Sequence, residues 1–215
     1  MNERTSQSAP WPKLKRDLVA ILRGLAPSDC QAVVSALIEV GFEAIEIPLN
    51  SPDPFRSIEM ASLLAPDEVL IGAGTVLDVA SVDRLADCGG QLLVSPNVDA
   101  AVLTRAGEQG LVTMPGVFTA TEALAAAALG ASALKFFPAN VLGPAGITAI
   151  RAVLPAGLPI GAVGGVSEKD FAAYAAVGIR TFGLGSSLFR PGDDAAIVKA
   201  RAEKTVAAYD AVFGG

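Results

Sequence analysis

The alternation of short β-rich runs with helix-like segments constrains the fold of this chain more than any other feature of its sequence. Successive strand-like runs start about 20–26 residues apart, as expected for one parallel β/α unit each. The eight runs are 18–24, 44–50, 70–76, 92–96, 111–116, 133–139, 159–166 and 181–189. The eight helix-like segments are 28–41, 55–64, 78–89, 99–110, 119–130, 144–154, one from Ser167, and 193–212. This count predicts a single α/β domain folded as a (β/α)8 TIM barrel.

Local signals mark where several of these helices begin. Ser28 with Gln31, and Thr119 with Glu122, have the spacing of a capping box, and Asp78 stands where an N-cap residue is expected. A doubly wound open sheet is the alternative fold for alternating strands and helices. That fold would have fewer strands or a GxGxxG fingerprint after the first strand, and the sequence has no such fingerprint. We therefore expect the barrel.

Charge and composition exclude several classes of partner. The formal net charge is -6 and the sequence pI about 4.7, so no basic surface is available to bind a nucleic acid. The longest uncharged run, 152–167, is shorter than the roughly 18 residues of a membrane span and is broken by prolines and glycines. We therefore expect small-molecule partners, with no nucleic acid and no membrane.

The first residues of the chain are polar and contain no apolar signal core. We expect residues 1–12 to be a loose tail and residues 13–215 to form the single domain of a cytoplasmic protein. Cys30 and Cys88 lie far apart and predict neither a disulfide framework nor a zinc site. The absence of histidine excludes Ser-His-Asp and Cys-His nucleophiles. Lysine and carboxylate chemistry remains.

One lysine lies inside an apolar, strand-like run. Lys135 is part of the run ALKFFPA at 133–139. Burial disfavours the charged ammonium and lowers its pKa, which makes a neutral amine available near pH 7. A neutral amine is what forms a Schiff base with a ketone. The alternative is an edge-strand lysine whose amine reaches solvent.

In a TIM barrel, chemistry belongs at the carboxyl ends of the strands. Glu46 lies near such an end, and the two-residue period of a strand sends it to the face opposite Ile45 and Ile47. If the isoleucines pack against helices, Glu46 points into the barrel and can exchange protons with a lysine there. The alternative is a structural ion pair. The other candidates at strand ends are Arg23, Asn50, Thr75, Ser95, Pro96, Asn97, Gly164, Gly165, Gly185, Ser186 and Ser187.

The glycines after the last two strands form a second group of candidates. Phosphates in such barrels commonly bind at these loops, where glycines let backbone N–H groups approach. Gly164, Gly165, Gly185 and Ser186 fit that place. The alternative is that these glycines only form turns.

Several motifs, in order over about residues 14–212, resemble those of the bacterial class I aldolases that cleave 2-keto-3-deoxy-6-phospho-aldonates. They are EIPLNSP at 46–52, GAGTV at 72–76, VSPN at 94–97, MPGVFTATE at 114–122, LKFFPA at 134–139, AVGGV at 162–166 and GLGSSLF at 183–189. The resemblance implies that Lys135 forms the Schiff base and that Glu46 is the general acid and base.

The resemblance also implies the remaining roles. Arg23 and Thr75 would lie near the carboxylate and keto end of pyruvate, Pro96 and Phe137 would pack the pocket, and Gly164, Gly165 and Ser186 would bind the phosphate. The partners would be a phosphorylated keto sugar acid as substrate and pyruvate and glyceraldehyde 3-phosphate as products. No metal or cofactor is needed, and the resemblance suggests a homotrimer.

Two positions bear on the substrate. Asn50 and Val163 resemble the galactonate-derived branch of the family, because the gluconate-derived branch usually has arginine and threonine there. The two substrates differ only at C4, so a gluconate-specific or dual-specificity enzyme is the alternative. Two readings from other classes are a phosphosugar isomerase or decarboxylase, which would need no imine-forming lysine, and a non-catalytic barrel that binds phosphometabolites.

Overall fold

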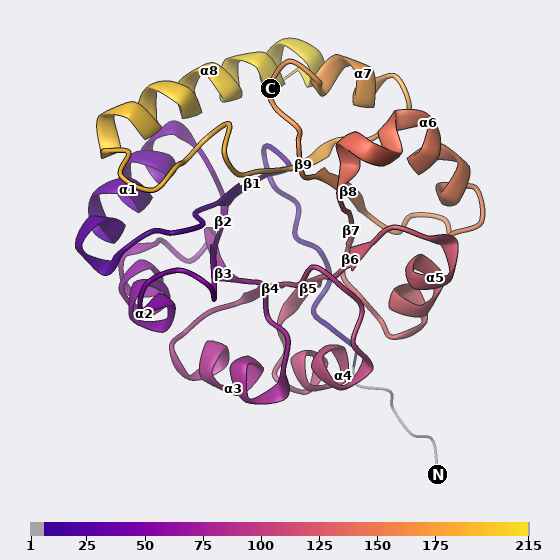
Figure 1. Cartoon of the computed structure of the whole chain (residues 1–215), viewed down its shortest axis with the longest axis horizontal. Helices are drawn as coiled ribbons and strands as arrows, with labels where there is room; N and C mark the ends of the chain where they lie inside the picture. Colours follow the sequence, from indigo (N-terminus) through magenta and orange to yellow (C-terminus); the bar gives the residue numbers. More distant parts are fainter. Residues whose placement is uncertain (1–6, 215) are drawn as a thin grey trace.

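The computed structural model describes residues 7–214 as a barrel of parallel strands surrounded by helices (Figure 1). The strands are β1 (Leu18–Ile21), β2 (Ala44–Pro48), β3 (Leu70–Gly74), β4 (Leu92–Val94), β5 (Val112–Met114), β6 (Gly116–Val117), β7 (Leu134–Phe136), β8 (Ile160–Val163) and β9 (Thr181–Leu184). The helices are α1 (Pro27–Val40), α2 (Pro54–Leu64), α3 (Val79–Asp87), α4 (Ala100–Glu108), α5 (Ala120–Ala128), α6 (Ala139–Arg151), α7 (Phe171–Ala175) and α8 (Ala195–Phe213). The predicted TIM-like barrel is confirmed.

The fifth predicted strand is split into β5 and β6 at Pro115. β5 pairs with β4, and β6 pairs with β7, so the two halves of one run join opposite sides of the sheet and bring the barrel near closure. Proline has no N–H for the ladder, which accounts for the break. At Gly116 a Cβ would collide with the backbone of Pro96, so the chain passes β4 closely only because residue 116 is glycine.

Two of the predicted helix starts are confirmed and one is wrong. Asp78 accepts a hydrogen bond from the N–H of Ser81 at 2.8 Å, and Thr119 forms a complete capping box with Glu122. Ser28 is not a cap, because α1 already begins at Pro27. Proline at the first helical position costs no hydrogen bond and has a φ suited to the helix.

Two other helices differ from expectation in extent. α6 begins at Ala139 rather than near 144, and a kink at Gly143, with φ of 64°, separates its first turn from the rest. The helix expected from Ser167 is only the short α7. Within residues 7–214 no helix combines the length and the apolar character needed to cross a membrane.

β2 shows how the strands separate the inside of the barrel from the outside. Ile45 and Ile47 are fully buried in the large cluster shared with the helices, as predicted, and Glu46 is buried on the opposite face. The barrel interior has its own apolar cluster, made of Val19, Ala44, Leu92, Val94, Val112, Met114, Ala133 and Val163. Glu46 is therefore an acidic side chain within a largely apolar barrel.

The chain before β1 crosses the end of the barrel at which the strands begin (Figure 1). Ala9 forms a parallel bridge with Val112, and its N–H donates to the carbonyl of Leu111 at 3.0 Å. Trp11 and Leu14 pack against the interior cluster. The prediction of a loose tail over residues 1–12 is therefore wrong for residues 8–11, which polar composition alone could not show to be paired; residues 1–6 lie outside the described residues.

Candidate active site

Lys135 lies in the middle of β7 and is only 6% exposed. The ladder pairs it with Gly116 on one side and Gly161 on the other, and its N–H donates to the carbonyl of Pro115 at 2.9 Å. Burial is the main cause that lowers the pKa of the Lys135 amine. The charge of Glu46 raises this pKa, and the charge of Arg23 lowers it further. The amine therefore becomes neutral at a lower pH than an exposed lysine.

Glu46 is the acidic counterpart of this lysine. It is 2% exposed, and burial raises the pKa of its carboxyl, against the pull of the positive charges of Lys135 and Arg23. Its Oε2 is buried and has no hydrogen-bond partner within residues 7–214. A carboxyl group with a raised pKa and an unpartnered oxygen can take up and release a proton near neutral pH.

Both side chains open into one cavity of about 190 Å³ at the carboxyl ends of the strands. Asn50 is the only predicted binding residue that does not contribute to its lining. The lining residues are Ile21, Arg23, Glu46, Thr75, Pro96, Lys135, Phe137, Val163, Gly164, Gly165, Val166, Gly183, Gly185 and Ser186. The structure thus brings together side chains from the first to the last strand.

Asn50 lies next to Arg23 rather than on the cavity wall. Its Oδ1 accepts a hydrogen bond from Nη1 of Arg23 at 2.5 Å, and Nη2 of Arg23 reaches Oγ1 of Thr75 at 3.5 Å. Thr75 has a φ of 58°, which is unusual for a β-branched residue and is the kind of strain found at functional sites. The guanidinium of Arg23 is therefore oriented by two neighbouring strand ends.

The predicted phosphate glycines also line the cavity. Gly164 and Gly165 have φ values of 92° and 68°, so both adopt a conformation that favours glycine. The Phe137 ring packs where a Cβ of Gly164 would lie, and Nζ of Lys135 is 5.0 Å from the centroid of that ring. Phe137 therefore links the lysine to the glycine loop.

Comparison with known proteins agrees with this geometry. The family model described as KDPG and KHG aldolase matches residues 13–202, a range that includes every residue lining the cavity. The chain belongs to the KDPG and KHG aldolase family. Two other strand-end candidates of this aldolase have structural hydrogen bonds instead: Ser95 donates to the carbonyl of Asn97 at 2.7 Å, and Ser187 to that of Val166 at 3.3 Å.

Two curated relatives match this chain over nearly their whole length. It is 69% identical over 206 residues to a Rhizobium meliloti (strain 1021) protein named "Probable 2-dehydro-3-deoxy-6-phosphogalactonate aldolase", with 96% of this chain and 97% of the relative covered. It is 45% identical over 195 residues to the "2-dehydro-3-deoxy-6-phosphogalactonate aldolase" of Escherichia coli (strain K12), covering 91% and 95%. A solved structure described as "Native KDPGal structure" superposes with a TM-score of 0.91 at 44% identity, covering 94% of this chain and 98% of that one.

Sequence reasoning missed several residues of this aldolase's cavity. Ile21, Val166 and Gly183 line it, and the only signal for them is their place next to predicted strand-end residues. Arg190 was also missed: its Nε donates to the carbonyl of Ser186 at 3.1 Å and so holds the loop after β9. An arginine four residues beyond Ser186 has no spacing rule that would mark it.

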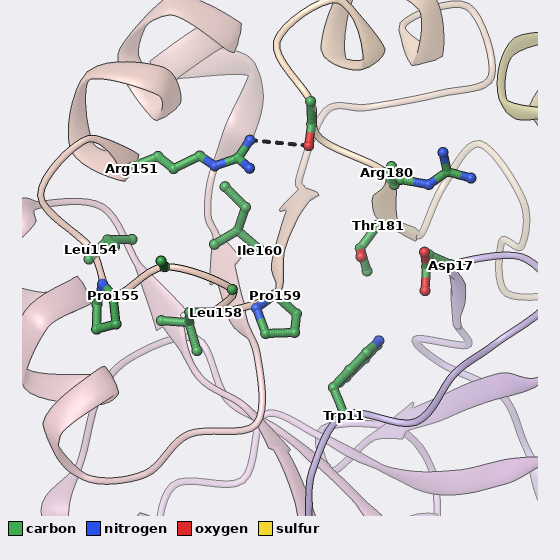
Figure 2. A pocket seen from close by; sticks show the side chains of 13 residues that line it. Trp11, Asp17, Arg151, Leu154, Pro155, Leu158, Pro159, Ile160, Arg180 and Thr181 are labelled. Atoms are coloured by element: carbon green, nitrogen blue, oxygen red, sulfur yellow. Dashed lines mark hydrogen bonds between the residues drawn. The ribbon is translucent and has the colours of Figure 1, made fainter.

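A larger hollow, of about 500 Å³, lies at the other end of the barrel of this aldolase (Figure 2). Trp11, Asp17, Arg151 and Arg180 are among the residues that line it. Both arginines have structural contacts: Arg151 donates to the carbonyls of Val177 and Gly178, and Arg180 lies 4.7 Å from the centroid of the Phe213 ring. No lysine lines this hollow, whereas Lys135 lines the smaller cavity.

Across the described residues, 7–214, no group of three or more acidic or cysteine side chains is placed to hold a metal ion. Cys30 and Cys88 are both free thiols. The expectation of a reaction without metal or cofactor stays a prediction, which a chelator can test.

Proposed function

We propose that this chain is a class I, Schiff-base aldolase that cleaves 2-dehydro-3-deoxy-6-phosphogalactonate to pyruvate and D-glyceraldehyde 3-phosphate. The observation that carries the proposal is the buried Lys135, with its lowered pKa, in the same cavity as a buried Glu46 with a raised one. Two relatives named for this activity, at 69% and 45% identity, support it.

The reaction begins with imine formation at Lys135. Its neutral amine adds to the C2 carbonyl of the substrate, and the carbinolamine loses water after Glu46 protonates its hydroxyl. The product is a protonated imine, with Glu46 now a carboxylate. The positive nitrogen is the electron sink for the next step, so no metal is required.

Cleavage then transfers one proton and shifts three electron pairs, one of which, from the O–H bond, becomes the C4=O bond of the aldehyde. The Glu46 carboxylate takes the proton of the C4 hydroxyl, the C3–C4 bond breaks, and its electrons form the C2–C3 double bond of an enamine as the imine nitrogen is neutralised. Glyceraldehyde 3-phosphate leaves as the aldehyde. Glu46 returns the proton to C3, and water hydrolyses the resulting imine to pyruvate and free Lys135.

The binding roles are those that the family resemblance suggests, and the place of each residue on the cavity wall supports them. Arg23 and Thr75 are assigned to the carboxylate end of pyruvate, Pro96 and Phe137 to packing, and Gly164, Gly165, Gly185 and Ser186 to the phosphate. A backbone phosphate site suits these glycines because N–H groups can approach an anion where no side chain intervenes. Ser186 stays in place through the bond from Arg190.

The choice of substrate epimer rests on Val163. Val163 lines the cavity one residue before the phosphate glycines, which suits a contact near C4 of a substrate spanning Lys135 and Gly165. A hydroxyl turned toward valine would lose its water partner, at about 1–3 kcal/mol for a buried unsatisfied group. Asn50 is behind Arg23, so its influence on the substrate passes through the orientation of that guanidinium.

The deciding experiment compares cleavage rates on the galactonate- and gluconate-derived phospho-substrates. Each rate is measured by coupled detection of the pyruvate released. We expect a preference for the galactonate-derived substrate and no loss of rate after EDTA treatment. Equal rates on both epimers would replace the proposal with a dual-specificity aldolase. Absence of a borohydride-trapped pyruvate adduct would favour an isomerase or decarboxylase, and absence of any turnover a non-catalytic binding protein.

Three coarser expectations are also proposals. We propose that residues 13–215 form one domain, that the protein is a homotrimer and that it is cytoplasmic. The family resemblance supports the trimer, and the two free thiols agree with a reducing compartment. Limited proteolysis, mass measurement in solution and cell fractionation test the three in turn; two stable fragments, a monomeric mass or a periplasmic location would contradict them.

A further inference from the structure

The Glu46 carboxylate occupies the space that a side chain at residue 74 would fill. A Cβ built on Gly74 would lie 2.6 Å from Oε1 of Glu46 and closer still to Oε2 and the carboxyl carbon. Real Cβ atoms essentially never come within 3.0 Å of a heavy atom outside their own and adjacent residues. Any residue other than glycine at position 74 is therefore incompatible with the position that Glu46 adopts.

The geometry of the sheet explains this contact. Glu46 is paired with Gly72 across the β2–β3 ladder, and Gly74 is paired with Pro48. Gly74 is thus the diagonal neighbour of Glu46 on the same, inward face, within reach of a long side chain. The glutamate lies across β3 because β3 has no side chain at that point.

Backbone conformation does not require glycine at this position. Gly74 is absent from the glycines with positive φ, whereas Gly164 and Gly165 are among them. Its carbonyl accepts a regular bond from the N–H of Leu49 at 2.8 Å. What matters at residue 74 is the missing side chain and not conformational freedom.

The atoms nearest to a side chain at residue 74 are not backbone atoms, in contrast to two other glycines. A Cβ on Gly72 would collide with the backbone of Leu92, and one on Gly116 with the backbone of Pro96. The three atoms nearest to a Cβ on Gly74 all belong to the side chain of Glu46, which can rotate away. An alanine at 74 therefore meets the carboxylate first and displaces it.

We propose that Gly74 is a positioning residue, whose missing side chain leaves the slot that holds the Glu46 carboxylate in the cavity with Lys135. The inference rests on the proposed function, because it assigns Gly74 a role through the general acid and base of that reaction. Glu46 touches the substrate, and Gly74 acts only through Glu46.

The test is Gly74→Ala, measured on steps that separate Lys135 from Glu46. Borohydride trapping of pyruvate reports the imine, and exchange of the pyruvate methyl protons in deuterated water reports proton transfer at C3. We expect the variant to trap pyruvate while kcat for cleavage and the exchange rate both fall about 100-fold, the lower range for loss of a general acid or base. KM should change little.

Glu46→Asp supplies the second variant, since its shorter side chain withdraws from the slot. In the Glu46→Asp background, Gly74→Ala should lower kcat and the exchange rate by a much smaller factor than in the wild type, because the collision is gone. If the two residues acted independently, their fold-losses would multiply. If Gly74→Ala alone does not fold, the double variant should fold again. Gly90→Ala is the matched control. Its Cβ would meet the side chain and the carbonyl oxygen of Leu85, which does not line the cavity, so it should lower stability and leave exchange near wild type.

Three results would overturn the role of Gly74. The first is wild-type exchange and cleavage in Gly74→Ala, the second is multiplicative losses in the double variant, and the third is failure of both variants to fold. Failure of the proposed function would show differently, as absence of trapping and cleavage in the unmodified enzyme.

Discussion

At the end where its strands begin, the barrel of this aldolase holds a hollow of about 500 Å³, and at the end where they finish a cavity of about 190 Å³. The larger hollow is lined by Trp11, Asp17, Arg151 and Arg180, among others (Figure 2). Arg151 already donates to two carbonyls, and Arg180 lies over the ring of Phe213. The smaller cavity contains a buried amine and a buried carboxyl with shifted pKa values. Chemical capacity at the two ends therefore follows the side chains and their burial and not the available volume.

The same strands build both ends of the barrel. The two ends differ because each strand has different inward side chains near its start and near its carboxyl end. Near the strand starts, Val19, Ala44 and Val112 fill the barrel, and the N-terminal segment covers it. Near the carboxyl ends of the strands, glycines leave room for Glu46 and for an open pocket. Apolar packing below keeps water from Lys135 and Glu46, which is the physical cause of both pKa shifts.

The largest expected effect is the loss of the nucleophile. Lys135→Ala should lower cleavage by at least about 10⁴-fold, since enzymatic accelerations start near 10⁶-fold and imine formation underlies every later step. Peptide mapping after borohydride reduction with pyruvate should find the adduct at Lys135, and Lys169→Ala is the control for a solvent-exposed lysine. An adduct at Lys13, Lys15, Lys169, Lys199 or Lys204 would show that the nucleophile does not lie in the cavity at the carboxyl ends of the strands.

Glu46→Gln should reduce cleavage by about 10²–10⁴-fold through loss of the general acid and base. It also removes a negative charge that raises the pKa of Lys135. The pKa of the amine should then fall, so the acid limb of pyruvate imine formation moves to lower pH. Arg23→Gln removes a charge that lowers this pKa and should move the limb to higher pH. Shifts in the same direction for both variants would show that these charges do not govern Lys135.

Gly165→Val tests whether the phosphate subsite is separate from the imine site. Valine is strained at a φ of 68° and would collide with Asn140, so the loop should no longer approach a phosphate. KM for the phosphorylated substrate should rise roughly 10–100-fold, as for loss of charge-assisted hydrogen bonds, while pyruvate trapping stays near wild type. Joint loss of both activities in a folded variant would argue against a distinct subsite.

Val163→Thr should shift the ratio of cleavage rates toward the gluconate-derived substrate, by up to roughly 5–150-fold, because the added hydroxyl offers a partner to the C4 hydroxyl of that epimer. Val166→Thr is a control at a neighbouring cavity residue outside the predicted C4 contact. An unchanged ratio in Val163→Thr would show that residue 163 does not distinguish C4 epimers.

The smallest effect on catalysis is expected at the opposite end. Arg151→Ala removes two hydrogen bonds to the carbonyls of Val177 and Gly178 and should lower stability by about 1 kcal/mol without changing kcat/KM. Urea unfolding and steady-state cleavage measure the two quantities. A large fall in kcat/KM with intact folding would mean that the lower hollow takes part in the reaction.

Period and local chemistry made parts of this structure predictable from sequence. The alternation around Glu46 predicted its inward face, and Asp78 and Thr119 cap helices because their hydrogen bonds are local. Features that depend on contacts between distant segments were not predictable. The hydrogen bond from Arg23 to Asn50 holds Asn50 away from the cavity wall, and the bridge between Ala9 and Val112 fixes a segment that looks loose by composition.

The packing of the N-terminal segment also determines where the described ends of the chain lie. Ala9 pairs with the start of β5, and Arg16 binds Asp210 near the end of α8 through two hydrogen bonds of 2.7 Å. Both ends are therefore on the face away from the cavity. An affinity tag, a fluorescent reporter or a surface tether joined to either end would leave substrate entry unobstructed, so immobilised enzyme should retain its turnover.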